Sequence, residues 1–484
     1  MNLSIAEIAK AVNGEIINNH DLNIPMIKNI VTDSRKILPD GLFFAIKGEK
    51  VDGHDFIPEV IDDGILGVVA QENSVKQIAL QDKKAIIIAV RDTIQALLDT
   101  AKYYKSLFKN IDKTVAVTGS VGKTTTKEFI YSVLATKFKT TKNEGNFNNE
   151  IGLPLTVFST AEDTEALVLE MGMSGFGEIK RLSETANPNT AAITNIGTSH
   201  IEMLGSKEGI KKAKFEILDG MDMNSNIILN ADDPLLYSEK NKTGRKEYFF
   251  GIKNSDADFT AENIELDYEK NISDFTVKIL NGTIITGSRF IIPAAGIHNI
   301  YDALPALITG KIYGMSDEEI QAGFNNFQNA KMRQNIYEYY GITIIDDCYN
   351  ASAESVLAAL DVLSGVAEKN RGRKIAVLSD ILESGNYSEQ IHSETGKAAV
   401  EKNIDIIYLS GEKSKVTYDT IEKIKRGAGN CMCRYFGDKS EIAQALYEEV
   451  KKGDVILFKA SRGMALETVI DDFKYKFIFE SMGV

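Results

Sequence analysis

The chain has 484 residues, of which 43% are hydrophobic and 26% are charged, and its formal net charge is −14. This length exceeds what one hydrophobic core usually serves, so we expect a globular protein of two to four domains. The negative charge argues against binding to nucleic acid or to an anionic membrane, because these polyanions attract cationic surfaces. The cysteines form no CxxC pair and are too few for a disulfide framework, which indicates buried or inert thiols: Cys348, Cys431 and Cys433.

The first 16 residues, MNLSIAEIAKAVNGEI, predict a short amphipathic helix. Glu7 and Lys10 interrupt its apolar positions, so the segment does not have the pattern of a signal peptide. No apolar run approaches the roughly 20 residues that a membrane-spanning helix needs. We therefore expect a cytoplasmic protein without membrane insertion.

The segment from about residue 25 to 90 alternates short apolar runs with polar turns, which predicts a small α/β domain. A helix is expected near 93–108. The strand-like text KTVAVTG then leads through a glycine loop directly into a helical pattern, GKTTTKEFIYSVLATKF. Buried strands and helices alternate after it, which predicts a mostly parallel sheet with further strands at 165–171, 190–196 and 226–230.

Residues 256–292 change to a period of two, which predicts an antiparallel β excursion. The alternation of strands and helices returns after residue 312 and predicts a second doubly wound sheet. The expected fold is therefore α/β with three domains: a small α/β N-terminal domain (1–85), a central parallel-sheet domain that binds a mononucleotide (86–312) and a C-terminal Rossmann-like domain (313–484).

The strongest local signal is a phosphate-binding loop between the strand and the helix of the central domain. Glycines allow backbone N–H groups to approach phosphate oxygens, Lys123 would neutralise the β and γ phosphates, and Thr124 would hold Mg²⁺. Val117 stands where the general pattern has glycine, and a chance GKTT turn is the alternative. The predicted ATP-binding residues here are Gly119, Ser120, Val121, Gly122, Lys123, Thr124 and Thr125.

Polar residues also follow several predicted strands. Ligands of open α/β sheets bind beyond the carboxyl ends of the strands, so these groups are candidates for one shared crevice. Each also has a structural alternative: a carboxylate can cap a helix, and a single histidine is more often a satisfied structural residue than a ligand. The candidates are Glu170, His200, Asn230, Asp232, Asp346 and Asp347.

Three segments are ambiguous from the residues alone. The text at 143–152, NEGNFNNEIG, is typical of a turn rich in glycine and asparagine. Lys211, Lys212 and Lys214 have the spacing of a solvated helix face. The text at 457–467, LFKASRGMALE, reads as a strand that runs into a helix with basic residues at the turn.

Segments along essentially the whole chain resemble, in order, those of the Mur ligase family. TDSRKILPDGLFFAIKGEKVDGHDF is similar to the family's uridine-nucleotide domain, and TGSVGKTT is the family's own form of the phosphate loop. LEMGMSGFGE, NIGTSHIEMLGS, NADDP, GIHNIYDAL, KMRQN, DDCYNAS, VLSDILESG and KASRGM follow. The resemblance implies an ATP-dependent amide ligase of peptidoglycan precursor synthesis. Within the family it is closest to ligases that join D-alanyl-D-alanine to UDP-MurNAc-tripeptide through an acyl phosphate, giving UDP-MurNAc-pentapeptide, ADP and phosphate.

The resemblance also assigns substrate-binding residues. Near the UDP sugar it implies Ser34, Arg35, Lys47, Gly48, Asp52 and His54. It overturns the turn interpretation of GNFNNEIG and implies a substrate loop with Asn146, Asn148 and Asn149. On the side of the incoming dipeptide it implies His392 and, within the DDCYNAS and KASRGM segments, Tyr349, Asn350, Lys459, Ser461 and Arg462.

Further ATP contacts are implied at Asn299, Arg333 and Asp347, and the resemblance places Mg²⁺, in two sites, at Thr124, Glu170 and His200. Lys214 falls where these ligases carry a carbamylated lysine, which would be a further metal ligand. Lys123, His200, Lys214 and Arg333 are the expected catalytic residues. The chain is expected to act as a monomer.

The chain departs from the family pattern at three positions: Asp302 replaces an asparagine, and Ser379 and Ala460 replace glycines. These departures put tight backbone geometry at 379 and 460 in question. Two alternatives remain open. A sister ligase would add a different amino acid, although the chain has no DNPR-like segment of the diaminopimelate-adding relatives. A regulatory protein would use the phosphate loop as a nucleotide switch.

Overall fold

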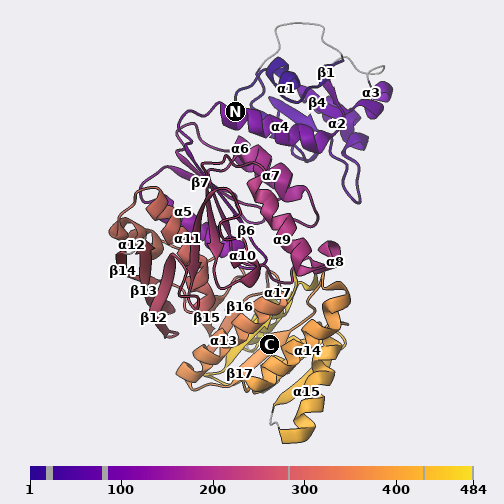
Figure 1. The fold of residues 1–484 in the computed structure, drawn as a ribbon. Helices are drawn as coiled ribbons and strands as arrows, with labels where there is room; N and C mark the ends of the chain where they lie inside the picture. Colours follow the sequence, from indigo (N-terminus) through magenta and orange to yellow (C-terminus); the bar gives the residue numbers. More distant parts are fainter. Residues whose placement is uncertain (18–25, 79–84, 282–283, 429–430, 482–484) are drawn as a thin grey trace.

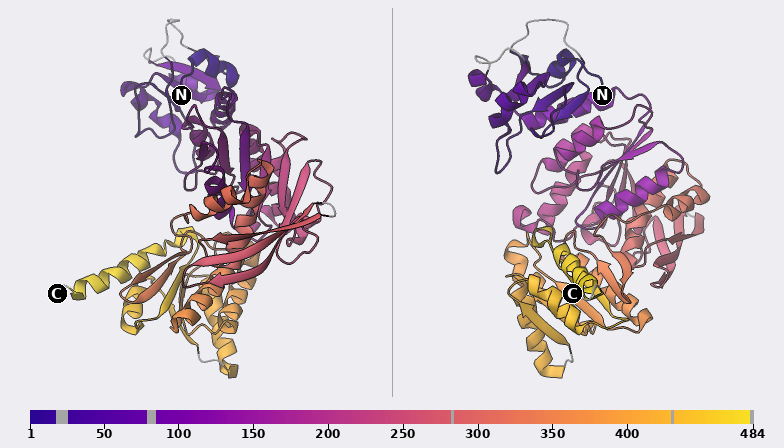
Figure 2. Two further views of the ribbon diagram at one scale, coloured as in Figure 1. Left: turned by 90° about the vertical axis from the view of Figure 1, so that its left-hand side faces the viewer. Right: turned by 180° about the vertical axis from the view of Figure 1, so that it is seen from behind.

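The computed structural model describes residues 1–17, 26–78, 85–281, 284–428 and 431–481. Three α/β domains follow one another along the molecule (Figure 1). The N-terminal domain and the C-terminal domain lie at opposite ends of the central one, and the two further views agree (Figure 2). The predicted three-domain α/β fold is confirmed.

The first domain is built on a five-stranded sheet in the order β1-β5-β4-β3-β2, in which only β1 is antiparallel to its neighbour. A capping box begins the first helix, since the Ser4 hydroxyl accepts from the Glu7 N–H and the Glu7 carboxylate accepts from the Ser4 N–H. The sheet reaches Val90, five residues past the boundary expected at residue 85. Its elements are α1 (Ile5–Ala11), β1 (Glu15–Ile16), β2 (Asn29–Val31), β3 (Gly41–Phe44), η1 (Gly53–Phe56), α2 (Ile57–Asp62), β4 (Gly67–Gln71), α3 (Glu72–Ile78) and β5 (Ile86–Val90).

The helix α4 (Thr93–Ser106) joins the first domain to the second. It packs against α1 and β4 on one side and against α6 (Gly152–Phe158) and α7 (Glu178–Ala186) on the other. One apolar core therefore runs from the first sheet through α4 to one face of the central sheet.

The second domain has a nine-stranded sheet in the order β14-β13-β12-β11-β10-β9-β6-β8-β7. It is parallel from β7 to β12 and ends in the antiparallel strands that the period of two predicted. The predicted strands at 165–171, 190–196 and 226–230 are present. The strands are β6 (Lys113–Thr118), β7 (Thr140–Lys142), β8 (Ala166–Glu170), β9 (Thr190–Ile193), β10 (Asn226–Asn230), β11 (Lys246–Gly251), β12 (Phe259–Asp267), β13 (Ile272–Asn281) and β14 (Ile284–Ile292).

Helices cover both faces of this sheet because successive strand residues point to opposite sides. Val115 and Val117 of β6 pack in the core under α5 (Lys123–Leu134) and α11 (Ile297–Ile312), while Ala116 packs in the core on the other face. The helix α12 (Asp317–Asn325), expected in the third domain, packs against α5 and β14, because Ile320 and Phe324 complete the central core. The other helices are α8 (Ile201–Leu204), α9 (Lys207–Phe215), η2 (Glu216–Leu218) and α10 (Pro234–Tyr237).

The third domain has a six-stranded sheet in the order β15-β16-β20-β17-β18-β19, parallel except for β15. The alternation of strands and helices predicted after residue 312 is present, and β15 adds an antiparallel strand at one edge. Its helix α17 projects away from the body of the domain in the left view of Figure 2. The elements are β15 (Asn335–Tyr339), β16 (Ile342–Asp346), α13 (Ala353–Asn370), β17 (Lys374–Leu378), η3 (Gly385–Tyr387), α14 (Ser388–Glu401), β18 (Ile406–Ser410), α15 (Ser414–Ala428), β19 (Met432–Phe436), α16 (Ser440–Glu449), β20 (Val455–Lys459), η4 (Arg462–Met464) and α17 (Glu467–Ser481).

Within the described ranges, no helix is both long enough and apolar enough to cross a membrane. The three cysteines are free thiols, and burial raises the pKa of each of them. A raised thiol pKa disfavours the reactive thiolate, in line with the expectation of inert cysteines.

Candidate active site

The phosphate loop connects β6 to the first turn of α5. Gly122 has φ +85° and precedes the helix, and a Cβ atom there would overlap the Asp302 carboxyl group. Gly119 has φ +154°, and a Cβ atom there would overlap the Thr194 hydroxyl. Both positions therefore require glycine, and the predicted strand, loop and helix are present.

The segment after β9 holds this loop in place. The Ser120 N–H donates to the Asn195 carbonyl at 3.0 Å, and the Val121 N–H donates to Asn195 Oδ1 at 3.0 Å. The Val121 carbonyl accepts from the Asn195 side chain at 2.9 Å. Such contacts preorganise the loop backbone before a ligand arrives.

Lys123 is the first residue of α5, directly after the loop. Its Nζ donates to the carbonyls of Gly119 at 2.9 Å and Ser120 at 3.3 Å. Burial lowers the pKa of this ammonium group, the charge of Glu170 opposes that shift, and Arg333 adds to it. The buried hydroxyls of Thr118 and Ser120 have no hydrogen-bond partner within the described chain. Unpaired buried hydroxyls in a phosphate loop fit a polar ligand.

The Glu170 carboxylate lies beside the first turn of α5. Its Oε2 accepts from the Thr124 hydroxyl at 2.8 Å, and its Oε1 accepts from Asn148 Nδ2 at 2.8 Å. No cluster of three or more histidine, cysteine, aspartate or glutamate side chains suited to a metal occurs in the described ranges. Mg²⁺ does not need one, because it usually binds one or two carboxylates together with water and phosphate oxygens.

His200 makes its polar contact with the third domain. Its Nδ1 pairs with Glu383 Oε2 at 2.6 Å, and the hydrogen bond from His200 lowers the pKa of the Glu383 carboxyl. His200 has φ +62° and Glu383 has φ +57°, so both ends of the pair stand in left-handed backbone. The pair joins the two domains at the edge of the site.

Lys214 is 1% exposed, so the interpretation of a solvated face is wrong for this residue and holds for Lys212, which is exposed. The face of α9 that carries Lys214 packs inward because Ile210 and Ala213 belong to the core. Burial, and next to it the charge of Lys123, lowers the pKa of Lys214 well below its usual value. No hydrogen bond or ion pair reaches its Nζ from the described residues.

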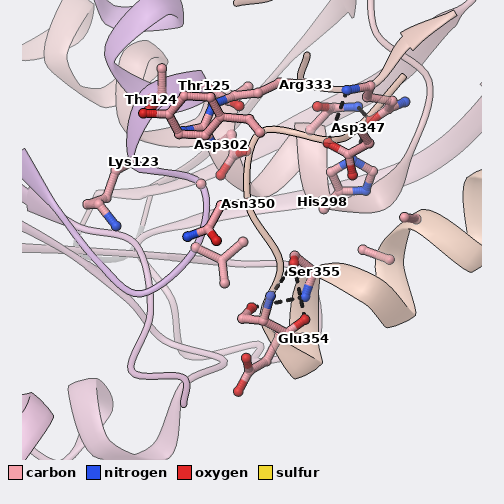
Figure 3. A pocket seen from close by; sticks show the side chains of 18 of the residues that line it. Lys123, Thr124, Thr125, His298, Asp302, Arg333, Asp347, Asn350, Glu354 and Ser355 are labelled. Carbon is pink, nitrogen blue, oxygen red and sulfur yellow. Dashed lines mark hydrogen bonds between the residues drawn. The ribbon is translucent and has the colours of Figure 1, made fainter. Parts of the chain in front are cut away.

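The phosphate loop opens into a cavity of about 280 Å³ between the second and third domains. In the view of Figure 3, Lys123 lies on one side of Asn350, and Arg333, Asp347 and His298 gather on the other. The predicted ATP residues Asn299, Arg333 and Asp347 therefore line the same cavity as the phosphate loop.

One end of this cavity is organised by Gln334. Its Oε1 accepts from His298 Nε2 at 2.6 Å and from Asn299 Nδ2 at 3.1 Å, and its backbone N–H donates to Asp347 Oδ1 at 3.2 Å. Arg333 stacks over the ring of Tyr349 at 4.3 Å. Sequence reasoning missed His298 and Gln334, although each is adjacent to a residue that it named.

Lys459 brings the acceptor segment to the same cavity. The side chain is 2% exposed, and its Nζ donates to Asp347 Oδ2 at 2.6 Å and to the Asn350 carbonyl at 3.1 Å. A buried ammonium needs such partners to offset its lost hydration. Lys459 thus joins the segments that carry Tyr349 and Ser461.

A second cavity of about 150 Å³ adjoins the first and shares Ser120, Lys123 and Asn350 with it. His200 and Glu383 line it together with Ser461 and Arg462. The Ser461 hydroxyl accepts from the Leu382 N–H at 2.9 Å, while Arg462 pairs with Glu467 at 2.7 Å. His392 is buried behind the residues that line the second cavity, and its Nε2 accepts from the Ile381 N–H at 3.1 Å.

The remaining strand-end candidates divide into two groups. Asn230 lines the first cavity, where its Nδ2 donates to the Thr194 carbonyl at 3.1 Å. Asp232 instead accepts from three consecutive N–H groups, at 252–254, and from the Tyr301 hydroxyl. Asp346 accepts from the Cys348 N–H. The last two aspartates therefore have structural partners in loops, although neither of them caps a helix.

The three departures from the family pattern fit their surroundings. Ser379 donates to the Ser410 carbonyl at 2.6 Å, Ala460 is fully buried, and neither is among the left-handed residues of the described chain. Asp302 stands in the first cavity, and burial raises the pKa of its carboxyl to about 8, although the Thr126 hydroxyl and Arg333 act in the opposite direction.

The candidates of the first domain lie in two separate turns, and His54 among them is buried. His54 is fixed by Asp52, which accepts from its Nδ1 at 2.6 Å, and by the Gln71 N–H, which donates to its Nε2 at 3.0 Å. A β-bridge joins Lys47 to Asp52 and shapes the turn around Gly48. Ser34 and Arg35 lie in the other turn, where the Arg35 guanidinium lowers the pKa of Asp33 to about 2.

The asparagine loop combines structural and free side chains. Asn149 Oδ1 accepts from the N–H groups of Ile151 and Gly152 where α6 starts, and Asn148 Nδ2 donates to Glu170. Asn146 is exposed. The segment is a turn, as its composition predicts, and it also contacts the candidate metal carboxylate.

Known proteins similar to this chain share one family. Three family profiles match: "Mur ligase family, catalytic domain" at 26–110, "Mur ligase middle domain" at 117–310 and "Mur ligase, glutamate ligase domain" at 332–462. A Bacillus subtilis relative named UDP-N-acetylmuramoyl-tripeptide–D-alanyl-D-alanine ligase is 37% identical over 473 residues, 97% of this chain and 98% of its own.

Solved structures of Mur ligases are also similar to this chain over nearly its whole length. MurF from Acinetobacter baumannii superposes with a TM-score of 0.88 at 28% identity, covering 98% of this chain and 99% of its own. The MurF ligase from Thermotoga maritima in complex with ADP superposes with a TM-score of 0.79 at 27% identity, covering 94% and 99%.

Proposed function

The chain belongs to the Mur ligase family, and we propose that it joins D-alanyl-D-alanine to UDP-MurNAc-tripeptide at the expense of ATP. The main observation that supports this proposal is the pair of cavities that meet at Ser120 and Lys123 of the phosphate loop. One cavity suits the nucleotide, and the other leaves room for an acceptor beside the phosphate that is transferred.

The chemistry follows from the substrates. A carboxylate is a poor electrophile, so its oxygen first attacks the γ phosphorus of ATP, and the bond to the ADP oxygen breaks. The amine of the dipeptide then attacks the acyl phosphate carbon, loses a proton, and phosphate leaves with the former carboxylate oxygen. Lys123 and Arg333 line the first cavity and supply positive charge where the transferred phosphoryl group spreads negative charge.

Mg²⁺ fits the residues next to the phosphate loop. The Thr124 hydroxyl and the Glu170 carboxylate are held together and keep oxygen lone pairs for a hard cation. When bound, the ion would neutralise phosphate charge during transfer. His200 is engaged with Glu383, so we place it at the domain contact beside the second cavity.

Lys214 suits carbamylation. Its amine nitrogen would attack the carbon of CO₂, form an N–C bond and release a proton, which requires the neutral amine. Burial without a partner, beside the charge of Lys123, favours that neutral form. The resulting carbamate would be an anionic oxygen ligand for a second Mg²⁺.

The domains divide the substrates between them. We place the UDP sugar against the turns that carry Arg35 and Lys47, the peptide carboxylate near Asn146 and Asn148, and the dipeptide in the second cavity with Ser461 and Arg462. Contact between the second and third domains would exclude water, which otherwise hydrolyses the acyl phosphate. We propose that the chain acts as a monomer in the cytoplasm, where ATP is available.

A phosphate-release assay tests the proposal. The chain is supplied with ATP, Mg²⁺, D-alanyl-D-alanine and UDP-MurNAc-tripeptide ending in either lysine or diaminopimelate, with Lys123→Ala as the inactive control. We expect phosphate release that depends on the dipeptide, and the pentapeptide product in the mass spectrum. Turnover with a single amino acid in place of the dipeptide would identify a sister ligase. ATP binding without turnover under any of these conditions would favour the nucleotide switch.

A further inference from the structure

Asn143 is a fully buried side chain that carries no role in the proposed chemistry. Its Oδ1 accepts from the Glu170 N–H at 2.9 Å, and its Nδ2 donates to the Glu170 carbonyl at 3.1 Å. The same Nδ2 donates to the Phe147 carbonyl at 2.8 Å. One amide group therefore binds the backbone at the end of β8 and the backbone of the asparagine loop.

Lys127 of α5 holds the backbone of Asn143. It is fully buried, and its Nζ donates to the Asn143 carbonyl at 2.7 Å and pairs with Glu128 at 3.1 Å. Thr124 and Lys127 are three residues apart in α5 and so share a helix face. One face of α5 thus contacts both the Glu170 carboxylate, through Thr124, and the residue that holds its backbone, through Lys127.

The contacts beyond Asn143 reach the substrate loop. Asn148 donates to Glu170 Oε1 at 2.8 Å, and its carbonyl accepts from the Gly172 N–H at 2.8 Å. The loop that carries Asn148 leaves Asn143 and returns to it through Phe147. A displacement of Asn143 would therefore move the metal carboxylate and the substrate loop together.

We propose that Asn143, held by Lys127, is a positioning residue. It fixes the position of Glu170, the carboxylate proposed to bind Mg²⁺, relative to the loop proposed to bind the nucleotide tripeptide. This inference rests on the proposed function. Outer partners of metal ligands typically contribute about 10- to 100-fold in metal affinity, because they fix the direction of the ligand's lone pairs. Asn143, Lys127 and Glu170 are not among the residues that line the two cavities, which are the proposed sites of the nucleotide and the dipeptide.

The test uses the full-length chain and two variants, Asn143→Ala and Lys127→Met. We expect Mn²⁺ binding in the presence of ADP, followed by electron paramagnetic resonance, to weaken about tenfold or more in Asn143→Ala. Calorimetry should show weaker binding of UDP-MurNAc-tripeptide as well. The KM for D-alanyl-D-alanine should stay within about twofold, and high Mg²⁺ should restore part of kcat. Lys127→Met should show smaller shifts in the same direction.

Asn189 provides the matched control. It also binds strand backbone with its side chain, accepting from the Thr114 N–H at 2.9 Å, but it lies where β6 begins, at the opposite end from the phosphate loop. Asn189→Ala should lose stability without a change in Mn²⁺ or tripeptide binding. If Asn189→Ala weakens Mn²⁺ and tripeptide binding as much as Asn143→Ala does, the effect of Asn143→Ala comes from a general loss of stability, and the proposal is overturned.

Each outcome decides the question. Wild-type metal and tripeptide affinity in a folded Asn143→Ala variant would refute the role. If that variant does not fold, unchanged affinities in Lys127→Met would refute the coupling through α5, and the expected shifts would support it. A wild-type chain that binds Mn²⁺ with ADP but never forms pentapeptide would refute the proposed function while leaving the positioning role intact.

Discussion

The Oδ1 atom of Asp302 occupies the space that a Cβ atom on Gly122 would fill, so a buried carboxyl group touches the phosphate loop. Its side chain is buried, with 7% exposed, and its hydrogen bond to Thr126 is long, at 3.4 Å. The other charged groups that face the cavity are Lys123, Arg333, Asp347, Glu354 and Lys459. Neutral Asp302 can stay beside the loop without repelling phosphate.

The first prediction concerns the pH dependence that this carboxyl creates. Burial raises the pKa of Asp302 from 3.8 to about 8. Between these values the unfolded chain has lost the proton and the folded chain keeps it, so stability falls as pH rises, by up to about 1.4 kcal/mol per pH unit. Below the lower value and above the higher one, the contribution is constant.

Urea unfolding of the wild type and of Asp302→Asn from pH 5 to pH 8 measures this difference. Asparagine has nearly the same shape and does not titrate, so the variant should gain stability relative to the wild type as pH rises. Parallel curves across the range would mean that Asp302 is ionised throughout in the folded protein.

The second prediction is that Lys123→Ala nearly abolishes turnover and leaves the fold intact. The ammonium hydrogen-bonds only to carbonyls of its own loop among its described partners, and removing it deletes no core packing. The loss of charge stabilisation during phosphoryl transfer should lower kcat by about 100-fold or more. Phosphate release and the melting temperature measure the two effects, and near-normal kcat in a folded variant would contradict the role of Lys123.

Sequence patterns predicted the parts of this site that depend on neighbours along the chain. The order of strand, glycine loop and helix located Lys123 and Thr124, and the end of a buried strand located Glu170. The same reasoning placed Lys214 on a solvated face. Three lysines close together in a helix have the spacing that is typical of a solvent-exposed face. Only the packing of Ile210 and Ala213 shows which face of α9 turns inward.

Contacts between segments that are distant along the chain could not be predicted from the sequence. Gln334 binds His298 across 36 positions, and a single sequence contains no signal for that pair. The helix α12 gives a similar case at the level of domains. Its residues fall in the range expected for the third domain, and the sequence does not say that Ile320 and Phe324 pack in the central core.

The third prediction follows from that packing. A fragment of residues 1–328 keeps α12 and should bind UDP-MurNAc-tripeptide without the third domain, because the proposed contacts lie in the first two domains. A fragment that ends at residue 312 exposes the core positions filled by Ile320 and Phe324 and should melt at lower temperature. Calorimetry measures binding by the longer fragment. A folded 1–328 fragment that does not bind, beside a full chain that does, would place essential contacts in the third domain.

The fourth prediction concerns Lys214. If this lysine carries a carbamate, Lys214→Ala should be nearly inactive, because it removes an anionic ligand that an ammonium group cannot replace. Lys212→Ala is the matched control, since Lys212 lies on the same helix but is exposed, and it should keep normal activity. Mass spectrometry under native conditions, with and without bicarbonate, should detect the added carboxyl group in the wild type and in Lys212→Ala only.

Chemical rescue completes this test. A small carboxylate such as formate or acetate should restore part of the activity of Lys214→Ala by occupying the vacated anionic position. Rescue should be incomplete, because a free acid lacks the high effective concentration of a tethered group. Rescue should also be absent from Lys123→Ala, whose missing charge is positive. A fully active Lys214→Ala enzyme would exclude an essential carbamate and return Lys214 to a purely structural role in the packing of α9.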